Sequence, residues 1–332
     1  MSGLAESKLV DRFGREVRYL RLSVTDRCNL RCTYCMAEDM KFLPKARVLS
    51  LEEMVLVSEA FVELGVEKIR LTGGEPLVRK GIVELAQSLS QIKGLRELVM
   101  TTNGVLLTQY AKDLKQAGVS RINISIDSLK HERFRKLTRF GALTDVLNGI
   151  EAAKEAGFER IKLNAVILRG INDDEVLSLA EFAVSHGLDI SYIEEMPLGE
   201  IGSHNRSETA VANISIKDLL SRELGLDRHD HNDSASGPSK YMKVTGTASR
   251  VGFISPMTEN FCASCNRVRV TAEGRLLLCL GNEHSLNLRS IIRDRPKDLK
   301  QEILASIVRK PQKHEFDPND ITITRHMSAT GG

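Results

Sequence analysis

The chain has 332 residues, of which 42% are hydrophobic and 27% are charged, and its formal net charge is only +3. This composition excludes collagen-like, low-complexity and wholly disordered proteins, and so small a surplus of positive charge gives no reason to expect general attraction to nucleic acid or membranes. The length predicts roughly two domains, or one large α/β barrel.

Short β-branched segments alternate with amphipathic segments through the first two-thirds of the chain, a pattern typical of βα units around a parallel sheet. Strands are predicted over residues 19–25, 68–72, 97–102, 121–126, 160–168 and 189–196. The first helix is predicted to begin after Ser50, which has capping-box spacing with Glu53. Further helices are predicted over residues 82–92, 108–117, 143–156 and 173–186. Six such units predict an α/β fold, an incomplete (βα)6-type TIM barrel whose reactive face lies at the carboxyl ends of the strands.

The predicted strands carry polar side chains on one face and apolar side chains on the other. In the first strand Arg21 and Ser23 alternate with Leu22. The polar face of the next four strands carries Arg70, Thr72, Thr101, Asn103, Asn123, Ser125, Asp127, Lys162 and Asn164. One alternative is a sheet with one solvated face, but parallel sheets are almost always covered on both faces. We therefore expect a splayed barrel with a polar, anion-accepting lumen.

The composition changes from Leu198 onward. Residues 198–205 predict a long loop, and residues 229–239 predict an exposed, turn-rich segment. A second small region begins at about Tyr241. We therefore expect a barrel domain over residues 1–240 and a C-terminal region over residues 241–332, which ends in Gly331 and Gly332.

The six cysteines form two sets of three, namely Cys28, Cys32 and Cys35, and Cys262, Cys265 and Cys279. They are too sparse for a secreted disulfide scaffold, and the sequence shows neither an apolar signal region nor a long apolar span. We therefore expect a cytoplasmic protein whose thiols bind metal. The first set has no fourth Cys or His nearby, which favours a 4Fe–4S cluster with one free iron over a closed zinc site. The second set is ambiguous, because His284 could complete a zinc site.

The segment from Cys28 to Cys35 resembles the CxxxCxxC motif of radical S-adenosylmethionine (SAM) enzymes, with an aromatic residue before the last cysteine. Residues 72–76, with the sequence TGGEP, resemble the stretch with which that family receives the amino group of SAM. Glycines allow the backbone to approach a ligand closely, and a carboxylate complements an ammonium group. The resemblance implies that the free iron chelates SAM, which is also contacted by Tyr34, Gly74, Ser125 and Met196.

Residues 23–29, residues 265–269 and the Gly-Gly ending resemble the molybdenum-cofactor biosynthesis protein A family, the GTP 3',8-cyclases, over essentially the whole chain. This resemblance implies a second 4Fe–4S cluster on Cys262, Cys265 and Cys279 and a tail that reaches the active site. It also implies GTP contacts from Arg21, Arg70, Thr101, Lys162, Arg267, Val268 and Arg269. Ser191 departs from the family pattern, because many members have an arginine there. One phosphate contact is therefore expected to be weakened or supplied by another residue.

The reaction implied by the resemblance is that of a radical cyclase. The first cluster passes an electron to SAM, the resulting 5'-deoxyadenosyl radical takes the 3' hydrogen of GTP, and the 3' carbon attacks guanine C8, with the second cluster binding guanine. The product would be (8S)-3',8-cyclo-7,8-dihydroguanosine 5'-triphosphate, made in the first step of molybdenum cofactor (molybdopterin) biosynthesis. Expected partners are an electron donor and a downstream cyclic pyranopterin monophosphate synthase, and a homodimer is one expectation for assembly.

Two alternatives remain from the sequence. One is another radical SAM enzyme with an auxiliary cluster, acting on a peptide or RNA. The other is a binding module with zinc in the second cysteine set and no catalysis. The small net charge and the cations gathered in the predicted lumen favour a compact polyanion as the substrate.

Overall fold

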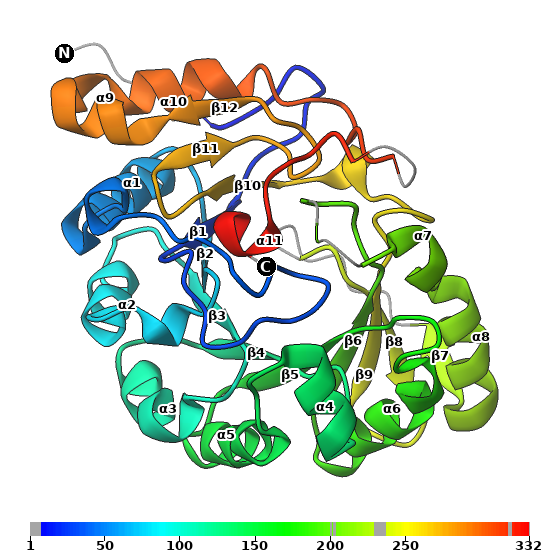
Figure 1. The fold of residues 1–332 in the computed structure, drawn as a ribbon. Coiled ribbons are helices and arrows are strands. Elements are labelled where there is room, and N and C mark those ends of the chain that lie inside the picture. Colours follow the sequence, from blue (N-terminus) through cyan, green and yellow to red (C-terminus); the bar gives the residue numbers. More distant parts are fainter. Residues whose placement is uncertain (1–7, 200, 202–203, 229–236, 318–320, 332) are drawn as a thin grey trace.

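The structure is a computed structural model that describes residues 8–199, 201, 204–228, 237–317 and 321–331. Gly332 and residues 229–236 of the predicted turn-rich segment lie outside the described residues. Within the described part, one twelve-stranded sheet in the order β12-β11-β10-β1-β2-β3-β4-β5-β6-β9-β8-β7 curves around the centre of the molecule (Figure 1).

Eight neighbouring strands of this sheet run parallel. In sheet order they are β10 (Arg267–Val270), β1 (Tyr19–Ser23), β2 (Lys68–Thr72), β3 (Glu97–Thr102), β4 (Arg121–Ser125), β5 (Arg160–Val166), β6 (Asp189–Ile193) and β9 (Arg250–Ile254). Antiparallel strands extend both edges, namely β11 (Arg275–Leu277) and β12 (Ser285–Asn287) beyond β10, and β8 (Lys240–Val244) and β7 (Leu226–Arg228) beyond β9. The six predicted strands are confirmed, although four of them end one to three residues earlier than predicted.

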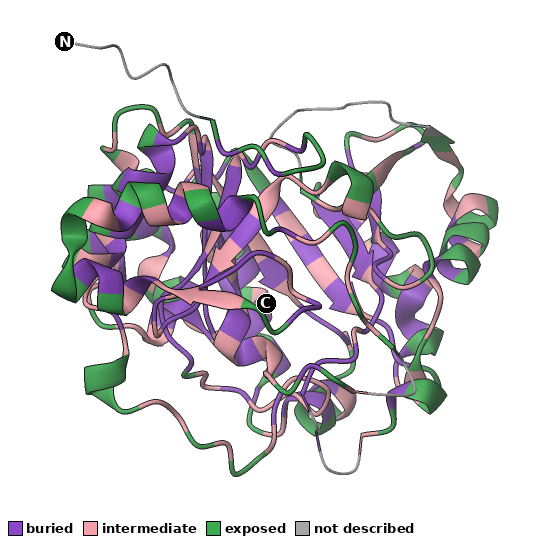
Figure 2. Ribbon diagram, turned by 90° about the horizontal axis from the view of Figure 1, so that it is seen from above, coloured by how far each residue is buried: buried purple, intermediate pink, exposed green. Residues whose placement is uncertain are grey.

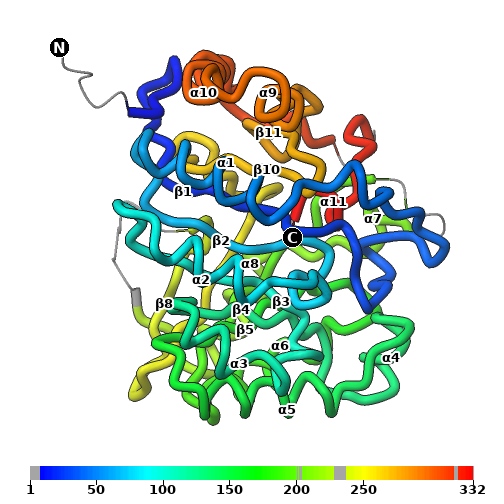
Figure 3. The backbone as a smooth tube through the Cα atoms, turned by 90° about the vertical axis from the view of Figure 1, so that its left-hand side faces the viewer, coloured from blue at the N-terminus to red at the C-terminus, as the bar shows by residue number. Residues whose placement is uncertain are grey.

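Helices cover the outer face of the sheet (Figures 1 and 3). They are α1 (Leu51–Glu63), α2 (Ile82–Ser90), α3 (Leu107–Gln116), α4 (His131–Thr138), α5 (Leu143–Glu155) and α6 (Val176–Ser185). The capping box of α1 is confirmed, because the Glu53 backbone N–H donates to Ser50 Oγ at 3.1 Å and the Ser50 N–H donates to Glu53 Oε2 at 2.8 Å. The sequence analysis missed α4, a short polar helix whose N-terminus has no side-chain cap.

The chain after β6 contributes both helices and strands. Helices α7 (Arg206–Thr209) and α8 (Asn213–Leu224) follow the predicted loop, and α9 (Leu288–Asp294), α10 (Leu299–Ile307) and α11 (Met327–Thr330) follow β12. Short 3-10 turns lie at Lys45–Arg47, Pro76–Val78, Asp173–Glu175, Cys262–Ser264 and Pro296–Asp298. Strands β9 and β10 pair with β6 and β1, so residues on both sides of position 240 share one sheet. The domain boundary near residue 240 stays a prediction.

The two faces of the parallel strands differ in polarity, as predicted. Apolar side chains such as Leu22, Leu71 and Ile124 are fully buried under the helices. Inner-face side chains such as Arg21 and Lys162 are only partly buried. Figure 2 shows how burial is distributed over the whole fold, with buried residues in the strands and exposed residues on the outer helices. Among the described helices, none combines the length and the apolar character that a membrane crossing requires.

Candidate active site

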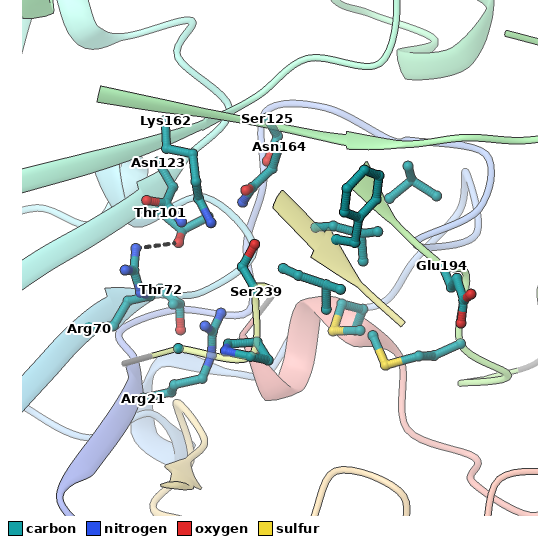
Figure 4. A pocket seen from close by; sticks show the side chains of 18 of the residues that line it. Arg21, Arg70, Thr72, Thr101, Asn123, Ser125, Lys162, Asn164, Glu194 and Ser239 are labelled. Carbon is teal, nitrogen blue, oxygen red and sulfur yellow. Dashed lines mark hydrogen bonds between the residues drawn. The ribbon is translucent and has the colours of Figure 1, made fainter. Parts of the chain in front are cut away.

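The inner face of the barrel encloses a cavity of about 1410 Å³. Figure 4 shows Arg21, Arg70 and Lys162 projecting into it from three different strands. Its lining brings together ten of the predicted ligand contacts: Arg21, Tyr34, Arg70, Gly74, Thr101, Ser125, Lys162, Met196, Arg267 and Arg269. Val268 is the exception, because its side chain is buried in the apolar core with 1% exposure. Only the backbone of Val268 is therefore available to a ligand.

Strand register places three arginines in one row across the cavity wall. Arg21 of β1 lies opposite Arg70 of β2 on one side and opposite Arg269 of β10 on the other. Burial lowers the pKa of Arg21 to about 10, the neighbouring Tyr19 opposing this shift and Arg70 adding to it. Burial, together with the charges of Arg21 and Arg267, also lowers the pKa of Arg269. Neighbouring strands are only about 5 Å apart, so this row of like charges is suited to a polyanionic ligand.

Tyr19 lies next to this row, in register with Lys68 and Arg267, and was missed by the sequence analysis. Its side chain is 1% exposed, and its hydroxyl accepts a hydrogen bond from Arg70 Nε at 2.5 Å. Burial alone would raise the pKa of Tyr19, but the charges of Arg70, Arg21 and Lys68 outweigh it and lower the pKa to about 6. Strand alternation could have identified Tyr19, since it is two residues before Arg21 and therefore on the same face.

The opposite wall holds Lys162 beside Tyr241 of β8. Lys162 Nζ lies 5.8 Å from the centre of the Tyr241 ring, and burial lowers the pKa of Lys162. The guanidinium of Arg250 lies 4.3 Å from the same ring centre and pairs with Asp189 at 2.6 Å. Tyr241 is a second cavity residue that the sequence analysis missed, because its strand was not predicted. The partly buried ammonium group of Lys162 therefore lies between the Tyr241 ring and the cavity.

Ser191 lies on β6, near Tyr241 and at the position where many family members have an arginine. Its hydroxyl lies 2.9 Å from the hydroxyl of Ser239, which lines the cavity. Position 191 therefore supplies a neutral hydroxyl, hydrogen-bonded to that of Ser239, and no positive charge, as the sequence indicates.

The first cysteine set lies in the loop that follows β1, at the carboxyl end of the barrel strands. Cys28, Cys32 and Cys35 are free, partly exposed thiols, and all three line the cavity. Burial raises the pKa of Cys28 to about 11 and that of Cys35 to about 12, and it raises the pKa of Cys32 well above the usual range. These thiols would become thiolates on binding a metal centre.

Two buried carboxyl groups accompany the first cysteine set. Glu75 accepts hydrogen bonds from Thr102 Oγ1 at 2.7 Å and from the Asn103 backbone N–H at 2.6 Å, and burial raises its pKa to about 7. Asp127 accepts a hydrogen bond from the Tyr34 hydroxyl at 2.7 Å, and burial raises its pKa to about 6. A cationic ligand would favour the ionised form of both groups.

Gly73 and Gly74 bring the loop after β2 directly against the cysteine loop. The Gly74 N–H donates to the Thr25 carbonyl at 2.8 Å, and the Glu75 N–H donates to the Arg27 carbonyl at 2.8 Å. A Cβ atom on Gly73 would lie 2.6 Å from the Thr25 carbonyl oxygen, and one on Gly74 would overlap the Arg27 carbonyl. The two glycines are therefore required for the close approach of these loops.

The second cysteine set lies beside β10 and β11, where the parallel part of the sheet ends. Cys262 and Cys265 precede β10, and Cys279 follows β11. Burial would raise the pKa of Cys265, but the charges of Arg267 and Lys310 outweigh it and lower the pKa to about 7. The neighbouring residues Phe261, Ser264 and Asn266 line the cavity, so this set lies directly behind its wall.

The donor atoms fit clusters better than single metal ions. Within the described ranges, no three His, Cys, Asp or Glu side chains converge on one metal-ion position, and this includes His284 with the second set. A tetrahedral zinc site requires such convergence. A 4Fe–4S cluster bonds each thiolate to a different iron, so its cysteines can be more widely spaced. Each set supplies three thiols, which fit a cluster with one open iron.

The described end of the C-terminal tail follows α11, which lies near the centre of the view in Figure 1. Arg269 Nη1 donates a hydrogen bond to the carbonyl of Gly331. Gly331 has φ +78°, and a Cβ at this position would overlap the Thr72 hydroxyl, so both the backbone conformation and the space favour glycine. The described end of the tail therefore reaches the arginine row, as the resemblance implies.

Comparisons with known proteins agree over the whole chain. Residues 22–183 match the radical SAM superfamily, and residues 188–316 match the family described as Molybdenum Cofactor Synthesis C. The chain is 53% identical to GTP 3',8-cyclase 2 of Pseudomonas aeruginosa, covering 99% of this chain and 100% of that protein. It is 51% identical to GTP 3',8-cyclase of Saccharophagus degradans, with the same coverage of both chains.

A solved structure with a similar fold is that of Streptococcus suis SuiB bound to S-adenosylmethionine. Its TM-score is 0.62 at 13% identity, covering 90% of this chain and 69% of that chain. Identity this low supports the fold alone, and it confirms the predicted radical SAM partial barrel. The relatives at more than 50% identity decide the family. This chain belongs to the GTP 3',8-cyclase family of the radical SAM superfamily.

Proposed function

We propose that this chain holds SAM and GTP in separate parts of this cavity and converts GTP to (8S)-3',8-cyclo-7,8-dihydroguanosine 5'-triphosphate. As a GTP 3',8-cyclase of molybdenum cofactor biosynthesis, it uses SAM and two 4Fe–4S clusters. One observation carries the residue assignments. The same cavity has a cysteine set beside two buried carboxyl groups and, elsewhere on its wall, a row of arginines beside the other cysteine set.

The SAM site is formed around the first cysteine set. Cys28, Cys32 and Cys35 hold the first cluster in this assignment, and Cys262, Cys265 and Cys279 hold the second. When bound, the first cluster supplies the electron that cleaves SAM, and the second supplies an open iron for guanine.

Around the first cluster, Gly74 and Glu75 present backbone and carboxylate groups to the cationic amino acid part of SAM. The Tyr34 hydroxyl is fixed by Asp127 at 2.7 Å. Ser125 and Met196 line the same part of the assigned site, at the carboxyl ends of β4 and β6.

The GTP site is formed by the cationic walls. Arg21, Arg70, Arg267 and Arg269 present guanidinium groups suited to a triphosphate. Lys162 approaches from β5, and Thr101 accepts a hydrogen bond from Arg70 Nη1 at 3.1 Å. In this assignment Val268 contributes its backbone alone. Binding energy from the triphosphate orients the ribose and excludes water from the reacting atoms.

The partners beyond GTP and SAM follow from the family's chemistry. We propose an electron donor, a cyclic pyranopterin monophosphate synthase that consumes the product, a homodimeric assembly and a cytoplasmic location. We also propose the boundary near residue 240 between the barrel domain and the C-terminal region.

Isotope transfer tests the proposed reaction. Reconstituted enzyme would be incubated anaerobically with reductant, SAM and GTP deuterated at the 3' position, and 5'-deoxyadenosine would be recovered for mass spectrometry. We expect one deuterium in the recovered 5'-deoxyadenosine, and none when GTP is deuterated only at the 2' position. Absence of deuterium in the 3' experiment would contradict the proposed hydrogen abstraction.

A further inference from the structure

Lys310 is a buried lysine beside the second cysteine set. Its side chain is 1% exposed, and it follows α10 and lies beside β10. Its Nζ donates hydrogen bonds to the Leu278 carbonyl at 2.5 Å and to the Arg267 carbonyl at 3.0 Å. Leu278 directly precedes Cys279, and Arg267 is two residues after Cys265. The ammonium group therefore lies between two of the segments that carry the cysteines.

The surroundings of Lys310 differ from those of two other buried cations, Lys68 and Arg15. Lys68 pairs with Glu97 at 2.6 Å, and Arg15 pairs with Asp11 at 2.6 Å. Among the residues that the structure describes, Lys310 pairs with no carboxylate; it donates to two backbone carbonyls and also interacts with the Cys265 thiol. Burial of an ammonium without a counter-charge is costly, so a negative charge at this place would relieve that cost.

The second cysteine set provides this negative charge once it holds a cluster. Lys310 donates to the carbonyl of Leu278, next to Cys279, and to the carbonyl of Arg267, two residues after Cys265, so its positive charge lies beside two of the three cysteines. Cluster thiolates are anionic, and adding one electron makes the whole centre more negative. Charge and hydrogen bonding near the sulfurs are main determinants of cluster potentials.

We propose that Lys310 is a charge-compensating and positioning residue for the second cluster, and that its ammonium stabilises the reduced form of that cluster. This inference depends on the second cluster of the proposed function. It predicts that the second cluster has a less negative reduction potential than it would have with a neutral residue at position 310. It also predicts that the charge of Lys310 matters more than its two hydrogen bonds.

Substitutions at position 310 separate charge from hydrogen bonding. Lys310→Gln keeps a hydrogen-bond donor and removes the charge, whereas Lys310→Met removes both. Lys313→Gln is the matched control, because Lys313 is three residues further along and exposed. Each reconstituted enzyme would be titrated anaerobically with reductant while the two clusters are followed by electron paramagnetic resonance, and iron content would be measured in parallel.

We expect both Lys310 variants to shift the second-cluster potential to more negative values, with the first-cluster potential unchanged and the Lys313 variant equal to wild type. A wild-type potential in Lys310→Gln would overturn the inference, because it would assign the role to the hydrogen bonds. An equal shift of both clusters would also overturn it.

Metal-free protein provides an independent test. If Lys310 serves the cluster, Lys310→Met should not lower the thermal unfolding temperature of metal-free protein, because it removes an uncompensated buried charge. The same variant should release iron from the second site faster when challenged with a chelator. A large loss of stability in metal-free Lys310→Met would instead identify Lys310 as a structural crosslink.

The outcome for the wild-type enzyme separates this inference from the proposed function. Zinc in the second site of wild-type protein would contradict both. About eight irons per chain with unshifted potentials in the variants would contradict the role of Lys310 alone.

Discussion

The two cysteine sets supply equal numbers of thiols in different electrostatic surroundings, although burial raises the pKa of Cys279 in the second set as it does throughout the first. The first set has the buried carboxyl groups of Glu75 and Asp127 nearby, and burial raises the pKa of all its thiols. In the second set, Arg267 and Lys310 lower the pKa of Cys265 to about 7 although it is buried. The difference matches the ligands, because SAM is cationic at its sulfonium and ammonium groups and GTP is a polyanion. In the proposed function, these charges are what direct SAM to the first cluster and GTP to the second.

Removing either cysteine set is expected to have the largest effect. Replacing Cys28, Cys32 and Cys35 with alanine should abolish both SAM cleavage and GTP cyclisation. Replacing Cys262, Cys265 and Cys279 should abolish cyclisation but leave SAM cleavage detectable, because the first cluster remains. Each triple variant should lose about four irons. Iron analysis and the yields of 5'-deoxyadenosine and cyclised product measure these effects. Loss of SAM cleavage in the second variant would contradict the assignment of SAM cleavage to the first cluster alone.

The next largest effect is expected from Arg269→Ala. The variant should bind GTP about 10- to 100-fold more weakly, which corresponds to about 1.5–3 kcal/mol for hydrogen bonds to a charged group. Its affinity for SAM should be unchanged. Isothermal titration with each ligand measures both values. Arg293→Ala is the control, because Arg293 is an exposed arginine paired with Glu53 outside the cavity. Equal GTP affinity in wild type and Arg269→Ala would remove Arg269 from the site.

A smaller effect is expected from Glu75→Gln on the SAM side. The amide keeps the size of the side chain but removes the negative charge buried next to Gly74, which lines the cavity at the proposed SAM site. SAM affinity should fall about tenfold, or about 1.4 kcal/mol, while GTP affinity stays constant. The same titrations measure this, with Glu84→Gln on the outer helix α2 as the control. Weaker GTP binding in Glu75→Gln would show that the two ligand sites are not electrostatically independent.

A separate effect, on stability and not on ligand affinity, is expected at Tyr19 through pH. The folded-state pKa is lowered to about 6 from the usual 10, so between these values the unfolded chain binds one more proton than the folded chain. The free energy of unfolding should therefore rise with pH above about 6 and lose this contribution as pH falls through about 6, by at most about 1.4 kcal/mol per pH unit. Tyr19→Phe should flatten this dependence in urea unfolding of metal-free protein at pH 6.5 and 8.5. Equal slopes in the two proteins would contradict the ionised Tyr19.

Much of the barrel could be predicted from the sequence, because strand alternation and helix capping are local signals. Arg21, Arg70 and Lys162 were identified as lumen cations from alternation alone, and the structure places all three in the cavity. The pairing of β10 with β1 could not be predicted in this way, because it joins segments about 250 residues apart. The pairing of β9 with β6 likewise depends on tertiary structure.

The less predictable site residues are those whose role depends on these long-range pairings. Tyr241 reaches Lys162 only because β8 pairs with β9 at the edge of the sheet. Gly331 accepts a hydrogen bond from Arg269, which joins the tail to β10. Lys310 contacts the carbonyl of Arg267 on β10 and that of Leu278 just after β11, and no sequence pattern connects it to either. Motif resemblance supplied the cysteines and the tail, but the surrounding charges required the structure.

In the proposed function, SAM and GTP are bound in one cavity by separate groups of opposite charge. A double-variant cycle tests it most directly, with both ligands titrated into wild type, Glu75→Gln, Arg269→Ala and the double variant. We expect the double variant to lose as much SAM affinity as Glu75→Gln loses, and as much GTP affinity as Arg269→Ala loses. Both agreements should hold within about 0.5 kcal/mol. A coupling energy well above this value for either ligand would contradict the account.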